Sequence, residues 1–178
     1  MGEAEQAAAQ ERQYAEAAEK FGPALERLAR GYERDADKRR DLLQEIHVSL
    51  WLSLARFDGR CSLRTWVYRV AHNTATSKSV RPQMNAPVLL AIEDSWATIG
   101  DASNTEEGFD RKRALERLYE LIRQLKPLDR QVMLLYLEQL DAASIGEVTG
   151  LSPANVATKV RRLKQLLVQR FYTGKGHE

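Results

Sequence analysis

The side chains best suited to chemistry lie near the end of the 178-residue chain, where residues 151–170 hold five Lys or Arg and no Asp or Glu. Basic side chains on a helix bind DNA phosphates, and polar side chains beside them read base edges in the major groove. Such a face predicts contact with duplex DNA. Its members would be Ser152, Asn155, Thr158, Lys159, Arg161, Arg162 and Gln165.

The residues around this basic face have the pattern of a helix-turn-helix. Residues 142–149 form a short helical segment, and Gly150 supplies a turn conformation that other residues disfavour. Ser152 and Pro153 then match the N-cap and the first position of a second helix. An ordinary helical hairpin with solvated charges is the alternative. The agreement of turn, cap and charge favours DNA binding.

A second group of candidate residues lies between residues 41 and 73. An amphipathic helix opens at 41–45 with polar groups beside apolar ones, a surface suited to a protein partner. The turn at 57–60 leads into a segment that interleaves arginines with aromatic residues. This mixture suits single-stranded nucleic acid, because Arg holds the backbone and rings stack on exposed bases. The alternative for Arg64, Arg69 and His72 is that they are solvated helix charges. Trp51 and Trp66 follow apolar stripes, so we expect them in the core rather than as stacking platforms.

Helical spacing dominates the elements that must position these residues, and strand signals are nearly absent, so we predict an all-α fold. Residues 3–20 are good helix formers with almost no apolar stripe. Clearer helices are expected from Pro23, over about 41–56, and from Ser62 to Arg81. Pro82 ends the last of these, because proline lacks the amide donor. Helical spacing resumes at Arg111.

Between these helical parts, residues 82–110 hold six acids and no Lys or Arg, a composition that cannot offset the entropy of ordering. We therefore expect two small helical bundles joined by a flexible acidic linker, with the helix-turn-helix in the C-terminal bundle. The expected divisions are a helical or mobile extension at 1–20, a first bundle at 21–81, the linker at 82–110, a second bundle at 111–172 and a tail at 173–178.

Composition limits the function classes. With 43% apolar and 29% charged residues the chain reads as globular, and no stretch approaches the roughly 20 apolar residues of a membrane span. A lone cysteine, Cys61, suits a reducing cytosol and is expected to be a small loop residue rather than a redox sensor. His47, His72 and His177 lack ligand spacing, and phosphate-binding or nucleophile motifs are missing. We expect no metal, no cofactor, no catalytic residue and no enzyme activity.

Several motifs together resemble a known family. The N-terminal ones are Asp41-Leu42-Leu43-Gln44-Glu45, Trp51, Phe57-Asp58-Gly59-Arg60 and the run at 65–73. They resemble region two of the extracytoplasmic-function sigma factors of RNA polymerase. The segment 125–130 and the helix containing 155–160 resemble region four of the same family, in the same order along the chain.

The resemblance implies a division of labour between the two parts. The first would dock on core RNA polymerase through Asp41, Leu42, Gln44 and Glu45. It would also bind the melted minus-ten element of the promoter through Phe57, Asp58, Gly59, Arg60, Arg64, Arg69, His72 and Asn73. The basic face at 152–165 would read the duplex minus-thirty-five element. The family further implies a cytoplasmic protein, monomeric when free, with an inhibitory anti-sigma partner.

Two other functions remain open on the residues alone. A conventional helix-turn-helix regulator would use its N-terminal half for dimerisation and would bind palindromic DNA without polymerase. The second is a purely protein-binding helical adaptor, which would not explain the acid-free basic face at 151–170.

Overall fold

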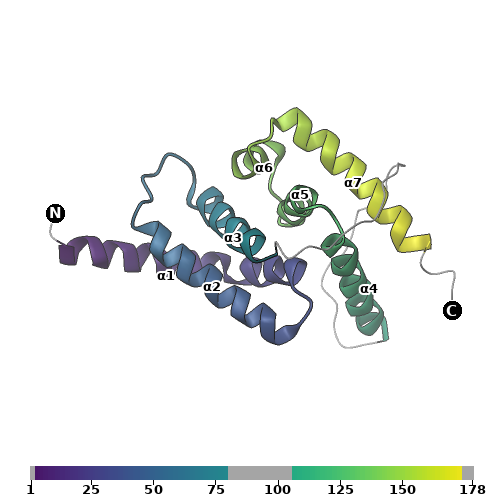
Figure 1. Cartoon of the computed structure of the whole chain (residues 1–178), viewed down its shortest axis with the longest axis horizontal. Coiled ribbons are helices and arrows are strands. Elements are labelled where there is room, and N and C mark those ends of the chain that lie inside the picture. The colour runs from purple at the N-terminus through teal and green to yellow at the C-terminus, as the bar shows by residue number, and fades with distance from the viewer. Residues whose placement is uncertain (1–2, 80–105, 174–178) are drawn as a thin grey trace.

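Seven α-helices make up the described part of the chain, residues 3–79 and 106–173 of this computed structural model (Figure 1). No strand occurs within these two ranges, so the predicted all-α fold is confirmed. None of the helices there is long and apolar enough to cross a membrane. In chain order they are α1 (Glu3–Tyr32), α2 (Ala36–Leu54), α3 (Leu63–Ser79), α4 (Glu106–Arg123), α5 (Pro127–Leu137), α6 (Ala142–Thr149) and α7 (Pro153–Thr173).

The first helix is longer than the sequence pattern suggested. α1 runs without interruption through Pro23, where the pattern had indicated a new start. Proline removes one backbone hydrogen bond from a helix interior and normally bends or ends it. Here buried residues on both sides of the proline, among them Ala17, Phe21 and Leu25, pack in the core. Burial of apolar surface offsets the missing hydrogen bond.

Asp35 sets the start of α2 several residues earlier than the sequence indicated. Its carboxylate accepts hydrogen bonds from the backbone N–H groups of Asp37 and Lys38, both at 3.0 Å, and these bonds lower the pKa of Asp35. Such a cap satisfies amide groups that have no partner within the helix. Further along α2, Trp51 is 45% exposed, so its expected place in the core was wrong. Trp66 of α3 is half-buried, and its indole N–H donates to the Ser53 hydroxyl at 3.1 Å.

The first helix of the C-terminal bundle begins earlier than expected. α4 begins at Glu106, inside the range that we expected to be linker. The rest of the expected linker, residues 82–105, and the tail from 174 lie outside the described residues. α5 begins at Pro127, whose fixed φ and missing N–H suit the first helical position.

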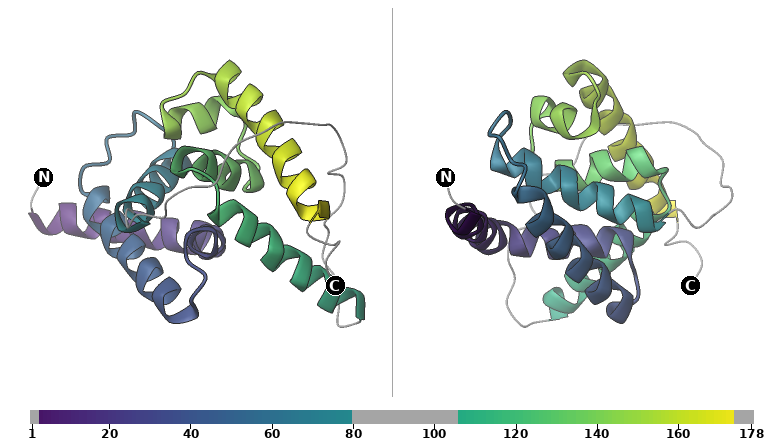
Figure 2. Two further views of the ribbon diagram at one scale, coloured as in Figure 1. Left: turned by 45° about the vertical axis from the view of Figure 1, so that its right-hand side comes forward. Right: turned by 60° about the vertical axis from the view of Figure 1, so that its left-hand side comes forward.

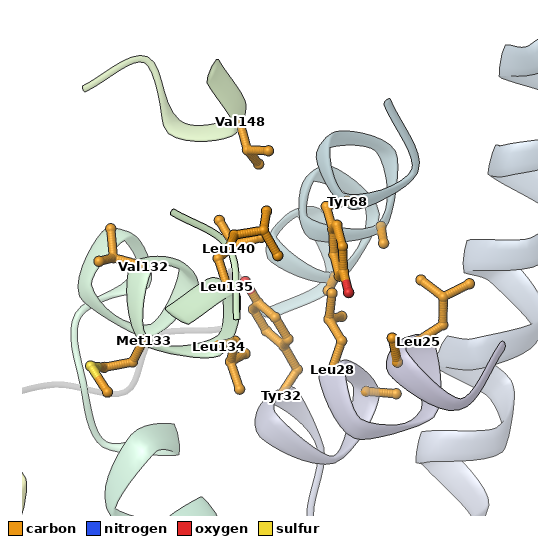
Figure 3. Close-up of a cluster of buried hydrophobic side chains, with 14 of the residues drawn as sticks. Leu25, Leu28, Tyr32, Tyr68, Val132, Met133, Leu134, Leu135, Leu140 and Val148 are labelled. Carbon is orange, nitrogen blue, oxygen red and sulfur yellow. The ribbon is translucent and has the colours of Figure 1, made fainter. Parts of the chain in front are cut away.

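The two bundles pack directly against each other, an arrangement that was not predicted from the sequence. α1 contacts α4 and α5, and α3 contacts α5 and α6 (Figures 1 and 2). One apolar cluster runs through both bundles, and Figure 3 shows Leu28 and Tyr32 of α1 facing Leu134 and Leu135 of α5. At the closest point, a Cβ added to Gly31 would meet Leu134 Cδ2 at 2.4 Å. Only a glycine at position 31 allows α1 and α5 to approach this closely without displacement of the leucine.

Candidate nucleic-acid interface

The turn of the helix-turn-helix depends on two glycines. Asp141 caps α6 by accepting the Ser144 N–H at 2.7 Å, which lowers the pKa of Asp141. Gly150 ends α6 with a φ of +79°, the left-handed conformation that glycine was predicted to supply. Gly146 is the second requirement, because a Cβ there would lie 2.5 Å from the Leu151 carbonyl oxygen. No local pattern marks this second glycine, since only the folded turn brings residues 146 and 151 together.

The face of α7 that was predicted to read DNA is largely open to solvent. Val156, Leu163 and Leu167 are buried on the opposite side, as their spacing predicted. The Ser152 hydroxyl accepts the Asn155 N–H at 3.3 Å, in keeping with its expected place as the N-cap. Of the seven predicted contact residues, Lys159 and Gln165 are partly buried, and those exposed are Ser152, Asn155, Thr158, Arg161 and Arg162.

Lys159 is tied to the preceding helix. Its Nζ lies 2.6 Å from Asp129 Oδ1, near the start of α5, and Arg162 approaches the other oxygen at 3.9 Å. The carboxylate is 12% exposed and the lysine side chain 22%. The pair therefore fixes the orientation of α7 on α5, and in this arrangement the charge of Lys159 is already partnered.

The turn before α3 presents polar groups at its tip and an aromatic pair at its base. Asp58, Gly59 and Arg60 are exposed; Gly59 has a φ of +76°, and Arg60 Nε pairs with Asp58 Oδ2 at 2.8 Å. Phe57 is half-buried, and its ring lies 5.4 Å from that of Trp66, tilted by 59°. The aromatic pair anchors the turn and leaves its tip accessible.

His72 lies in the interior of the molecule. The side chain is 1% exposed, and its Nδ1 shares a 2.8 Å hydrogen bond with the Tyr32 hydroxyl. Burial lowers the pKa of His72 to about 3, so the imidazole is neutral. In this arrangement it lies out of reach of a nucleic-acid strand, whereas its neighbour Asn73 is exposed.

The arginines of α3 contact the second bundle. Arg64 donates to the Glu138 carbonyl oxygen and Arg69 to the Glu147 carbonyl oxygen, each at 2.7 Å. Between them the Thr65 hydroxyl donates to the Glu147 carboxylate at 3.0 Å. These contacts span more than seventy residues of sequence, which is why no local pattern predicted them.

A bidentate ion pair strengthens the same junction. Arg27 Nε and Nη2 lie 2.6 and 2.7 Å from the two Glu138 carboxylate oxygens, a planar pairing that raises the pKa of Arg27. No local pattern points to Arg27, Glu138 or Glu147, because only the packing of the two bundles brings Glu138 and Glu147 to Arg27 and α3.

The four residues predicted to bind polymerase fall on two sides of α2. Asp41 and Gln44 are exposed, and Glu45 is partly exposed and pairs with Lys78 of α3. Leu42 is 6% exposed and belongs to the core, so its side chain does not face a partner in this structure. Two exposed apolar residues that were not among the predicted ones, Val48 and Leu52, continue the outward face of α2 at helical spacing.

The described residues form no cluster of three or more His, Cys, Asp or Glu side chains able to hold a metal ion. Cys61 lies partly buried in the turn before α3, in the kind of loop position expected for it. The candidate interface described above consists of exposed helix faces and of the junction between the bundles.

Comparison with known proteins gives matches to both bundles. Residues 17–81 match the family model described as Sigma-70 region 2, and residues 115–167 match that described as Sigma-70, region 4. RNA polymerase sigma factor YlaC of Bacillus subtilis (strain 168) is 27% identical over 140 residues, which cover 78% of this chain and 80% of that protein. CnrH, solved in complex with the cytosolic domain of CnrY, has a similar fold. Its TM-score is 0.67 at 18% identity, and the match covers 96% of this chain and 94% of that one.

Proposed function

This chain belongs to the sigma-70 family, as a sigma factor of the extracytoplasmic-function type that directs RNA polymerase to promoters, and we propose that its two bundles divide that work. Region two, α1–α3 with bounds near 21–81, binds core polymerase and the melted minus-ten element. Region four, α4–α7 with bounds near 111–172, binds the minus-thirty-five element. The residues between them serve as the linker.

Polymerase docking is assigned to the outward face of α2. Asp41 and Gln44 are exposed, and Val48 and Leu52 continue the same face one and two turns further on. Polar groups beside exposed apolar side chains are typical of a protein-binding surface. Glu45 contributes at its edge, while Leu42 supports the helix from the core.

Minus-ten binding is assigned to the turn before α3 and to α3 itself. The exposed tip, Asp58 to Arg60, would contact a base that leaves the stack, and Phe57 would form the apolar wall beneath it. Unstacking a base costs a few kcal/mol, which contacts to the extruded base and to the strand backbone must offset. Arg64, Arg69 and Asn73 supply the backbone contacts.

Minus-thirty-five binding is assigned to α7, and its exposed polar face is the observation that carries the proposal. Asn155, Thr158, Arg161 and Arg162 lie together on the solvent side of the second helix of a helix-turn-helix. This helix enters the major groove in proteins of that class. Ser152 and Gln165 lie at the ends of the same face, and Lys159 orients the helix through Asp129.

The partners and setting follow from the same family. We propose a non-enzymatic, cytoplasmic factor that is a monomer when free and has an inhibitory anti-sigma partner. The structural relative CnrH was solved in complex with the cytosolic domain of another protein, CnrY, which supports the last point.

The test is in vitro transcription with purified core polymerase on a randomised promoter library, with and without this protein. Enriched start sites that share two spaced elements are the expected result. Absence of transcripts, together with polymerase-free binding to palindromic DNA, would favour a conventional dimeric regulator instead. Absence of transcripts and of DNA binding, with a protein-binding function that survives Arg161→Glu/Arg162→Glu, would favour an adaptor whose function does not need DNA.

A further inference from the structure

The N-terminal half of α1 lies outside the part of the chain that matches the sigma-70 family models. The region-two match begins at residue 17, whereas α1 begins at Glu3 and continues through this boundary without a break. We propose that residues 3–16, the α1 extension, add a second helix to the surface of region two that binds core polymerase. The proposal rests on the proposed docking of polymerase on α2. The docking face of that helix consists of Asp41, Gln44, Val48 and Leu52.

Two side-chain contacts fix the α1 extension to the edge of the docking face. Gln10 Nε2 donates to the Trp51 carbonyl oxygen at 2.7 Å, and the Tyr14 hydroxyl lies 3.1 Å from His47 Nδ1. The rings of Tyr14 and His47 also meet edge to face, with centroids 6.1 Å apart and planes at 84°. Each helix contributes two residues that are one turn apart. The extension therefore lies alongside α2 over this turn and runs antiparallel to it (Figure 1).

The extension borders the most exposed apolar side chains of α2. His47 and Trp51 each follow a residue of the docking face, Gln44 and Val48, at a spacing of three, so the four share neighbouring positions on the helix surface. Val48, Trp51 and Leu52 are 53, 45 and 56% exposed, and they are three of the five exposed large hydrophobic residues in the described part of the chain. Apolar side chains that gather in this way mark a protein-binding surface.

The open side of the extension continues this surface. At about 100° per residue, Gln13 and Glu11 lie about 80° to either side of the line through Gln10 and Tyr14 that contacts α2. Gln13 is partly buried, so its side of the helix turns towards the rest of the bundle. Glu11 is exposed, as is Ala7 one turn before it. Their side of the extension therefore adjoins the outward, open side of α2.

The charge of the extension selects a protein partner rather than DNA. Residues 3–19 hold five Glu and one Arg, and Glu5, Glu11 and Glu16 are exposed. Asp41 adds an exposed acid on the docking face. DNA phosphates would be repelled by such a surface, since DNA binding depends on basic side chains. The surface suits a protein that offers apolar contacts within a basic rim. Core polymerase, which docks on the adjoining face, is the partner that meets this surface.

Photocrosslinking tests the contact directly. In the full chain, p-benzoylphenylalanine replaces either Glu11 or Glu16, and the product is mixed with purified core polymerase and irradiated. Both positions are exposed glutamates of α1, but Glu16 lies about 140° from the line that contacts α2 and serves as the matched control. We expect crosslinks to a polymerase subunit from position 11 and not from position 16. Crosslinks from position 11 only to a second copy of this chain, or none at all, overturn the proposal.

Charge reversal measures what the contact contributes to affinity. Glu11→Lys and Glu16→Lys change the net charge equally, so a general electrostatic effect is common to both. We expect Glu11→Lys alone to weaken the binding of core polymerase about five-fold in low salt, the scale of one exposed ion pair. The loss should shrink in high salt, which screens exposed charges. Titration of the labelled full chain gives the affinities, and a thermal melt checks that both variants are folded. Equal affinities for the two variants overturn the proposal.

A third variant separates this proposal from the docking assignment on which it rests. Asp41→Ala/Gln44→Ala alters the docking face of α2 and leaves the extension unchanged. If that variant loses affinity while Glu11→Lys and Glu16→Lys bind equally, docking on α2 stands and the extension has no part in it. Unchanged affinity in the α2 variant would contradict the docking assignment itself, and the proposal with it.

Discussion

The ammonium group of Lys159 lies 2.6 Å from a carboxylate oxygen of Asp129, which joins the DNA-reading helix α7 to the start of α5. Both side chains are mostly shielded from water, so each would be costly to leave without the other. Lys159 therefore has a structural role in orienting α7, in addition to any contact with a phosphate.

Asp129→Asn tests this orienting role. The change leaves the lysine without its charged partner, and we expect the free energy of unfolding to fall by about 2 kcal/mol, the scale of a hydrogen bond between charged groups. Affinity for minus-thirty-five duplex should fall with it, because the exposed face of α7 is no longer held in place. Urea unfolding and duplex binding are the measurements. Arg162→Ala is the control, since that side chain is 55% exposed and should lose affinity without losing stability.

Base readout and phosphate contact on α7 are separable by substitution. Asn155→Ala removes a side chain able to pair with a base edge, so specificity should relax at one promoter position at a cost of about 1–3 kcal/mol. Arg162→Ala should weaken binding to all sequences alike and reduce the slope of log affinity against log salt by about one. Binding selections at several salt concentrations distinguish the two patterns. A uniform loss for Asn155→Ala would contradict its assignment to base readout.

The two glycines of the helix-turn-helix should differ in how much a substitution by alanine destabilises the protein. Gly146→Ala places a methyl group 2.5 Å from the Leu151 carbonyl oxygen, so the backbone of the turn must move. We expect about 2–3 kcal/mol of destabilisation and a loss of duplex binding. Gly150→Ala meets nothing within 4 Å and suffers only the strain of its positive φ, about 1 kcal/mol. Thermal unfolding checks the order, and equal effects would contradict it.

The sequence predicted those features that depend on neighbours along the chain. Helical spacing, the Ser152 cap and the Gly150 turn are local, and all three appear as expected. The caps at Asp35 and Asp141 are local too, and a search for capping residues would have found them.

The features missed were those created by packing between distant segments. Three roles depend on such contacts: that of Gly31 on Leu134, that of Gly146 on Leu151 and that of Glu138 on Arg27. Trp51 is the opposite case, because a local apolar stripe predicted its burial and the prediction was wrong. It follows the apolar spacing of α2, but its side chain is 45% exposed and lies outside the buried face formed by Leu42, Ile46, Leu50 and Leu54.

At the start of α2, substitution of outward-facing residues should weaken polymerase binding, and substitution of an inward-facing residue should lower stability. Asp41→Ala/Gln44→Ala alters two exposed side chains, so we expect at least about a ten-fold loss of affinity for core polymerase, equivalent to about 1.4 kcal/mol. Its unfolding temperature should not change. Leu42→Ala instead removes a buried side chain and should lower the free energy of unfolding by about 2–5 kcal/mol. Titration of labelled protein with core polymerase measures the affinity, and a thermal melt measures the stability. Unchanged affinity in the double variant would remove α2 from the docking surface.

His72 should make region two sensitive to acid. Burial lowers the pKa of this histidine from 6.5 to about 3, so the folded protein stays neutral there while the unfolded chain binds a proton. Because the unfolded state binds more protons, stability falls as the pH drops below about 6.5 and continues to fall towards pH 3. From pH 7 to pH 5 the loss should be about 2 kcal/mol.

The measurement is urea unfolding by circular dichroism at pH 7 and pH 5, for the unaltered chain and for His72→Gln. Glutamine keeps a hydrogen-bonding group near Tyr32 but does not titrate, so the variant should be less stable at pH 7 and lose less on acidification. The remaining groups, including His47, whose pKa burial also lowers, contribute equally to both proteins and cancel in the difference. An identical loss in the two proteins would mean that His72 is accessible to protons in the folded state, and that α3 opens far more readily than its packing against Tyr32 indicates.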